Sequence, residues 1–185
     1  MLRTYVRMVD YAVRYDVRVI IIAGDWFDAH NISATTRNIV WDSIRSHPEI
    51  DFLYLRGNHD WDGNFISTQL EMPENLRLFS KEWQKYCYGN VEIWGAELPQ
   101  EKEAFARSIP VFDADAYNIV TLHGQMTEYR NREQTESFSM NDLRHRNIDY
   151  LALGHVHQYQ CKRLDARGIY CYPGCLEGRG FDECG

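Results

Sequence analysis

The fold is decided by the stretch Val19-Ile20-Ile21-Ile22-Ala23-Gly24-Asp25, an apolar run that ends in a glycine and a carboxylate. Short apolar runs of this kind are typical of strands buried in a parallel sheet. An apolar run followed at once by a polar cluster occurs three more times. These stretches are Phe52 to Asp60 (FLYLRGNHD), Ile119 to Gln125 (IVTLHGQ) and Tyr150 to His157 (YLALGHVH). Because ligands of α/β proteins bind beyond the carboxyl ends of the strands, we expect Asp, Asn and His side chains to gather at one edge of a sheet.

The segments between these strands indicate helical crossovers. Apolar residues recur at helical spacing over 2–15, and Ser33 is a suitable N-cap for a helix to about residue 46. Further strands are expected at 17–23, 52–56, 76–79, 117–122 and 149–153, hairpins at 86–94 and at 159–163 with 168–172, and helices at 101–108 and 140–147. Parallel strands come first and hairpins later, which predicts a two-sheet α/β sandwich forming one domain over residues 1–185. The polar stretch 124–139 shows no periodicity and is expected to be a long loop beside the site.

Composition limits the class of protein. The chain has 185 residues and a net charge of −7, which argues against a generally basic nucleic-acid binder. A local basic strip remains open, as does an ordinary solvated face; its residues would be Arg130, Arg132, Arg144, His145 and Arg146. The five cysteines are odd in number and include no Cys-x-x-Cys pair, so reduced thiols are expected. We find no apolar run of the roughly 18 residues that a membrane span requires and no signal peptide, so a cytoplasmic protein is expected.

The polar clusters contain the residue types that bind divalent metal ions. Asp25 has two carboxylate oxygens that can bridge two ions, Asn58 offers an amide oxygen, and the imidazoles are those of His123, His155 and His157. His155 and His157 are two residues apart and would face opposite ways in an extended strand, so both reach one site only if Gly154 starts a turn. Any one of these residues is ambiguous, because a lone Asp after a strand is usually a turn residue. Four such clusters together favour a metal site that performs hydrolysis.

At the level of motifs the chain resembles the calcineurin-like metallophosphoesterases. The motifs are Gly24-Asp25-Trp26-Phe27-Asp28, Gly57-Asn58-His59-Asp60, His123-Gly124 and Gly154-His155-Val156-His157, in the order found in that family. The sequences that flank His123 and His155, together with Tyr172-Pro173-Gly174-Cys175, are similar to those of the SbcD-type DNA repair exonuclease branch. The resemblance covers nearly the whole chain and implies a metal-dependent hydrolase of phosphoric ester bonds.

The resemblance also implies roles for individual residues. Asp25 would bridge two ions, Asn58, His123 and His155 would complete one site, and His157 would bind the second ion. His59 would contact the phosphate together with Asn58 and assist the leaving group, with Asp60 orienting it. Asp28 would accept a hydrogen bond from a histidine that binds the metal, without binding the metal itself. The implied ions are two divalent metals, manganese first, with iron or zinc as alternatives. DNA ends are the implied substrate, with a small-molecule phosphodiester as the alternative, and a second copy of the chain or an ATPase subunit would be the partner.

One departure from the family pattern limits the expectation for the second ion. The family opens with a strand ending in Asp-x-His, and no such motif precedes the expected helix over 2–15. The chain is therefore expected to be incomplete at both ends relative to the family. The second metal site is expected to be weak, because only Asp25 and His157 would bind that ion. An inactive or one-metal binding module remains the alternative to an enzyme.

Overall fold

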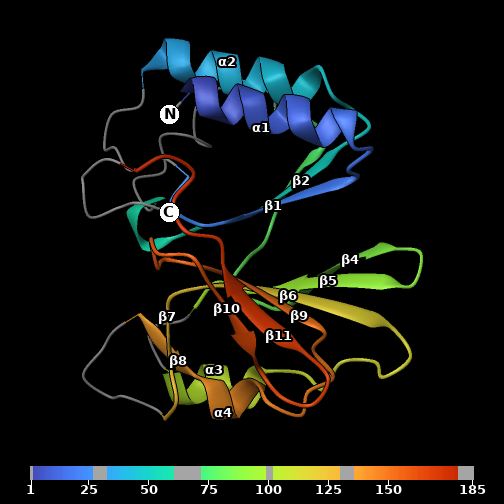
Figure 1. Ribbon diagram of the computed structural model, residues 1–185, viewed down its shortest axis with the longest axis vertical. Helices are drawn as coiled ribbons and strands as arrows, with labels where there is room; N and C mark the ends of the chain where they lie inside the picture. The colour runs from blue at the N-terminus through green and yellow to red at the C-terminus, as the bar shows by residue number, and fades with distance from the viewer. Residues whose placement is uncertain (1, 27–32, 61–71, 99–101, 130–135, 179–185) are drawn as a thin grey trace.

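Two β-sheets packed face to face form the centre of the computed structural model (Figure 1). The structure describes residues 2–26, 33–60, 72–98, 102–129 and 136–178. The smaller sheet is parallel, with the order β1-β2-β3, and consists of β1 (Val19–Ala23), β2 (Asp51–Leu55) and β3 (Leu76–Leu78). Its strands are short and mostly apolar, and four of the five residues of β2 are buried, as expected for a strand covered on both faces.

Helices α1 (Leu2–Arg14) and α2 (Ala34–Arg45) lie side by side over the outer face of this sheet (Figure 1). The Ser33 hydroxyl caps α2 by accepting from the backbone N–H of Thr36 at 3.1 Å. The two helices bury one apolar stripe each against alternate residues of β2. The residues of this core are Tyr5, Val9, Ala12, Val40, Trp41, Ile44, Ile50, Phe52, Tyr54 and Leu76.

The larger sheet has the order β10-β11-β9-β6-β5-β4. Its strands are β4 (Gln84–Tyr88), β5 (Val91–Gly95), β6 (Tyr117–His123), β9 (Tyr150–Gly154), β10 (Gln160–Arg163) and β11 (Ile169–Tyr172). The four inner strands are parallel, and the antiparallel hairpin partners β4 and β10 form the two edges. Helices α3 (Lys102–Ser108) and α4 (Met140–Leu143) lie on the face turned away from the smaller sheet (Figure 1).

Alternation along β2 joins the two sheets. Phe52 and Tyr54 pack toward the helices, whereas Leu53 and Leu55 belong to one buried cluster with Ile93 of the larger sheet, between the two layers. Successive side chains of a strand point to opposite faces, so a strand between a helix layer and a second sheet must be apolar on both faces. β2 meets this requirement in an arrangement of helices, smaller sheet, larger sheet and helices. The predicted two-sheet α/β sandwich is therefore confirmed. The extent of one domain over residues 1–185 stays a prediction.

Two elements differ from the sequence-based expectation. The stretch 124–139 is not a loop throughout, because β7 (Gln125–Thr127) and β8 (Ser137–Ser139) pair in parallel. The helix expected over 140–147 ends at Leu143, since His145 and Asn147 have φ angles of 61° and 66° that no right-handed helix accommodates. The Asn147 amide instead donates to the Phe112 carbonyl at 2.8 Å. The remaining expected helices and strands occur within a few residues of their predicted bounds. Among the described residues, no helix has the length and apolar character needed to span a membrane.

Candidate metal centre

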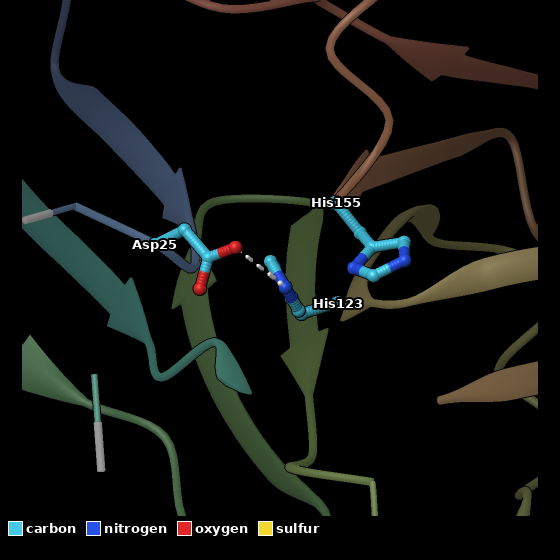
Figure 2. A group of neighbouring side chains, drawn as sticks. All are labelled: Asp25, His123 and His155. Carbon is cyan, nitrogen blue, oxygen red and sulfur yellow. Dashed lines mark ion pairs between the residues drawn. The ribbon is translucent and has the colours of Figure 1, made fainter. Parts of the chain in front are cut away.

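The carboxyl ends of four strands meet at the junction of the two sheets. In the larger sheet β6 pairs with β9 so that His123 lies opposite Gly154, directly before His155. Asp25 follows β1 from the smaller sheet, and its side chain points toward the two imidazoles (Figure 2). One possible ligand atom from each of Asp25, His123 and His155 lies within 4.8 Å of the other two. No other group of three His, Cys, Asp or Glu side chains in the described part of the chain meets this criterion.

His123 forms the floor of this group. Its side chain is 5% exposed, and its Nδ1 lies 2.7 Å from the Ala23 carbonyl oxygen, to which it must donate. In a neutral imidazole Nε2 then carries a lone pair, and it faces the Asn58 side-chain oxygen at 2.9 Å and the Asp25 carboxylate at 3.2 Å. Three electron-rich atoms that face one another need a proton or a metal cation between them. The donor set therefore fits a divalent ion bound by nitrogen and oxygen ligands.

The electrostatics agree with this geometry. Burial alone would lower the pKa of His123, but its hydrogen bonds to Asp25 and Ala23 outweigh burial and raise that pKa. Burial would raise the pKa of Asp25, whereas the hydrogen bond and positive charge of His123 lower it overall. The pKa of His155 is lowered by burial and by the nearby His123. Asp25 and His155 are thus poised as an anion and a neutral imidazole, the forms that coordinate metal ions.

Close backbone approach at the centre depends on three glycines. A Cβ on Gly24 or Gly154 would collide with the His123 ring, and on Gly154 also with the Ala23 carbonyl. A Cβ on Gly57 would collide with the Asp25 carboxylate and backbone. Asp25 and His155 themselves have φ angles of 50° and 98°, which few L-residues adopt. Such strained backbone at clustered polar residues is typical of functional sites.

Asp60 holds the turn that follows β2 against the turn that follows β1. Its Oδ2 accepts from the backbone N–H of Asp25 at 2.6 Å and from that of Gly57 at 2.8 Å. The Tyr54 hydroxyl donates to the same carboxylate, and burial raises the pKa of Asp60. The backbone N–H of His59 in turn donates to Asp25 Oδ1 at 3.0 Å. Asp25 is thus fixed through its backbone and through one carboxylate oxygen.

Two acidic residues that the sequence analysis did not single out lie at the same junction. Glu97, which follows β5 and is 3% exposed, accepts a bidentate ion pair from Arg56 at 2.6 and 3.0 Å. This pair joins the ends of β2 and β5 across the two sheets. Glu136 lies with Oε2 at 3.9 Å from His155 Nδ1. No local pattern marks either residue, because each acquires its partner only through tertiary packing.

Other predicted residues lie outside the three-residue group. His157 is not a member of it, and its carbonyl accepts from the Cys175 backbone N–H at 3.1 Å. Asp28 lies outside the described residues. Of the residues considered for a basic strip, Arg144 and Arg146 donate to the Leu164 and Ile109 carbonyls at the opposite end of β9, away from the centre. Arg130 and Arg132 lie outside the described residues.

Comparison with known proteins decides the family. The family model of the calcineurin-like phosphoesterase superfamily domain matches residues 2–184. The chain belongs to this superfamily. An uncharacterized metallophosphoesterase, YhaO of Bacillus subtilis (strain 168), is 32% identical over 190 aligned residues, which cover 96% of this chain and 46% of that protein.

One further relative and one solved structure are similar to this chain. The DNA double-strand break repair protein Mre11 of Sulfurisphaera tokodaii is 26% identical over 178 residues, covering 90% of this chain and 45% of that protein. The calcineurin-like chain thus spans about half the length of these two curated relatives. The crystal structure of TT1561 of Thermus thermophilus has the same fold at a TM-score of 0.58 and 13% identity, covering 95% of this chain and 84% of the other. The family binds divalent metals, in agreement with the donor set at Asp25, His123 and His155.

Proposed function

We propose that this calcineurin-like phosphoesterase hydrolyses phosphodiester bonds with divalent metal ions and that DNA ends are its substrate. The observation that carries the proposal is the convergence of Asp25, His123 and His155 within 4.8 Å at the strand ends. Support for a DNA substrate comes from the relative named as a DNA double-strand break repair protein. The residue types suit manganese, with iron or zinc as alternatives, because oxygen and imidazole donors are combined.

Asp25, Asn58, His123 and His155 are proposed to hold one ion. Asp25 would also reach a second ion, to which His157 would contribute. Bound ions of this kind act as Lewis acids toward phosphoryl oxygens and lower the pKa of a bound water. The Ala23 carbonyl keeps the proton of His123 on Nδ1, so that the lone pair of Nε2 would be available to the proposed ion.

His59 is proposed to act on the substrate. It is exposed and lies on the one-turn helix Asn58–Asp60, and its backbone N–H donates to Asp25. An imidazole can carry a proton near neutral pH and donate it to the leaving oxygen. Asn58 would direct its amide toward the phosphate as well as toward the ion.

The test is manganese-dependent hydrolysis of bis-nitrophenyl phosphate and of linear duplex DNA. His123→Gln should abolish hydrolysis of both, together with stoichiometric manganese binding by calorimetry. His145→Gln is the matched control, because His145 is exposed and lies before β9, away from the site. Hydrolysis that persists undiminished in His123→Gln would refute the proposed centre. Hydrolysis of the small ester without cleavage of DNA would favour the small-molecule alternative.

A one-metal or inactive binding module is the second candidate. It is favoured by the observation that the described residues bring only three His, Cys, Asp or Glu side chains together. Among the described strands, β1 pairs only with β2, and each of its five apolar residues is partly exposed. A preceding strand ending in Asp-x-His would pair there and complete the second site. Adding such a strand should raise manganese-dependent activity by orders of magnitude if the chain is an enzyme, and should change nothing if the chain is a binding module. A partner that covers β1, either a second copy or an ATPase subunit, is proposed on the family resemblance alone.

A further inference from the structure

Two cysteines face each other at one edge of the larger sheet. β10 and β11 are antiparallel, and their register places Cys161 directly opposite Cys171. Both are free thiols. β10 is the edge strand, so the pair lies at a border of the sheet and well apart from β4 at the other border (Figure 1).

The hydrogen-bond ladder shows which kind of pair this is. Beyond the strands, the Leu164 N–H donates to the Gly168 carbonyl at 3.0 Å, which makes these two residues a hydrogen-bonded pair. Hydrogen-bonded and non-hydrogen-bonded pairs alternate along an antiparallel ladder. The next pair, Arg163–Ile169, is therefore non-hydrogen-bonded, and Lys162–Tyr170 is hydrogen-bonded. The pair after these, Cys161–Cys171, is again non-hydrogen-bonded. In such pairs the Cα atoms are about 4.5 Å apart and the side chains are closest, a separation that a disulfide can span.

The register brings the two side chains next to each other on one face of the sheet. Burial raises the pKa of the Cys171 thiol, and the neighbouring Tyr150 hydroxyl and Cys161 thiol also influence that pKa. Cys161 is exposed, whereas Cys171 is 7% exposed. An accessible thiol beside a shielded one is the arrangement needed for attack followed by resolution.

We propose that Cys161 and Cys171 form a redox-active dithiol, a modification site that low-molecular-weight disulfides oxidise. The Cys161 thiolate attacks one sulfur of the small disulfide, which forms a mixed disulfide and releases one thiol. The Cys171 thiolate then attacks Sγ of Cys161, which closes the protein disulfide and releases the second thiol. The protein loses two electrons and two protons, and the small disulfide gains both as two thiols.

The location of the pair gives the modification a consequence. β10 follows the turn that carries His155 and His157, and β11 leads to Cys175, whose backbone N–H donates to the His157 carbonyl at 3.1 Å. A covalent link between the two strands restrains the base of this turn. The restraint also removes chain entropy from the unfolded state, so the oxidised form should be more resistant to heat.

The experiment uses the full chain, reduced and then equilibrated with oxidised glutathione. Remaining thiols are alkylated, and the linkage is identified by peptide mass mapping. The expected product is an intramolecular bond between Cys161 and Cys171, with Tm higher by roughly 5 °C or more. Cys161→Ser should remove both effects. Cys87→Ser is the matched control. Cys87 is also an exposed thiol on an edge strand, β4, but its cross-strand neighbour is Glu92 and not a cysteine. Its loss should change neither the intramolecular bond nor the rise in Tm.

A second variant tests the order of the steps. In Cys171→Ala the mixed disulfide at Cys161 should accumulate, because no thiol resolves it. If the mixed disulfide in Cys171→Ala is as short-lived as in the wild type, the proposal is overturned. It is also overturned if oxidation yields chiefly intermolecular bonds, or if the intramolecular bond forms without any rise in Tm. These readouts do not depend on phosphoesterase activity, so they stand or fall separately from the proposed function.

Discussion

Asp60→Asn should weaken metal binding rather than act on the chemistry of His59. The Asp60 carboxylate accepts from the backbone N–H groups of Asp25 and Gly57 through a single oxygen, and from the Tyr54 hydroxyl. Asparagine keeps the size and one acceptor oxygen but removes the negative charge. The backbone of Asp25 is then held less firmly, and the carboxylate that faces His123 shifts with it.

The magnitude follows from these contacts. Hydrogen bonds to a charged group contribute about 1.5–3 kcal/mol and neutral ones about 0.5–1.5 kcal/mol, so each bond weakens by about 1 kcal/mol. Burial raises the pKa of Asp60, which shows that its charge is costly, and relief of that cost offsets part of the loss. We expect a net loss of about 1–2 kcal/mol in the free energy of unfolding. Loss of a group that orients a metal ligand typically lowers metal affinity by about 10–100-fold, and we expect a decrease in that range.

Manganese titration by calorimetry and urea unfolding measure the two effects. Asp149→Asn is the matched control, since the Asp149 carboxylate also accepts from a backbone N–H, that of Asn118 at 2.8 Å, and from Arg167, but at the far end of β9. The control should lose stability and keep its manganese affinity. If Asp60→Asn binds manganese as tightly as the wild type while turnover falls, then Asp60 acts through His59 and the positioning argument is wrong.

Two other substitutions test the centre. His59→Ala should lower turnover on bis-nitrophenyl phosphate by about 10²–10⁴-fold while manganese stoichiometry by elemental analysis is unchanged, because a proton donor and not a ligand is lost. An equal loss of bound metal would instead identify His59 as a ligand. Gly154→Ala should reduce the free energy of unfolding in urea by about 1–3 kcal/mol or more and weaken manganese binding, because the new Cβ collides with the Ala23 carbonyl and the His123 ring. Gly89→Ala, where a Cβ meets open space, should leave manganese binding intact; the same weakening there would refute the steric argument.

The sequence was sufficient to predict the strands and the edge at which the polar residues gather. Runs such as Val19–Ala23 carry their own signal, because a buried parallel strand must be apolar on both faces. The polar cluster directly after each run then lies at the carboxyl edge of a sheet. The closeness of His123 and His155 follows from the pairing of β6 with β9, whereas the approach of Asp25 also depends on how the two sheets pack.

The features that were missed depend on long-range packing. The strands β7 and β8 have three residues each, too few for a period to be recognised. The early end of α4 depends on two non-glycine residues in the left-handed region, which the composition of the segment does not reveal. The φ angle of 98° at His155 sets where His157 lies, and no rule of sequence spacing gives that angle. Glu136 reaches His155 only because β8 pairs with β7.

The centre is also the junction that holds the two sheets together. His123 of the larger sheet donates to the Ala23 carbonyl of the smaller one, and Arg56 at the end of β2 pairs with the buried Glu97 beyond β5. The groups that orient the proposed ligands are therefore the same groups that fix one sheet on the other. Any ion that binds the folded state alone stabilises it by mass action. An ion bound at this junction would therefore stabilise the packing of the two sheets. A change that moves β1 relative to β6 should also change the affinity for metal.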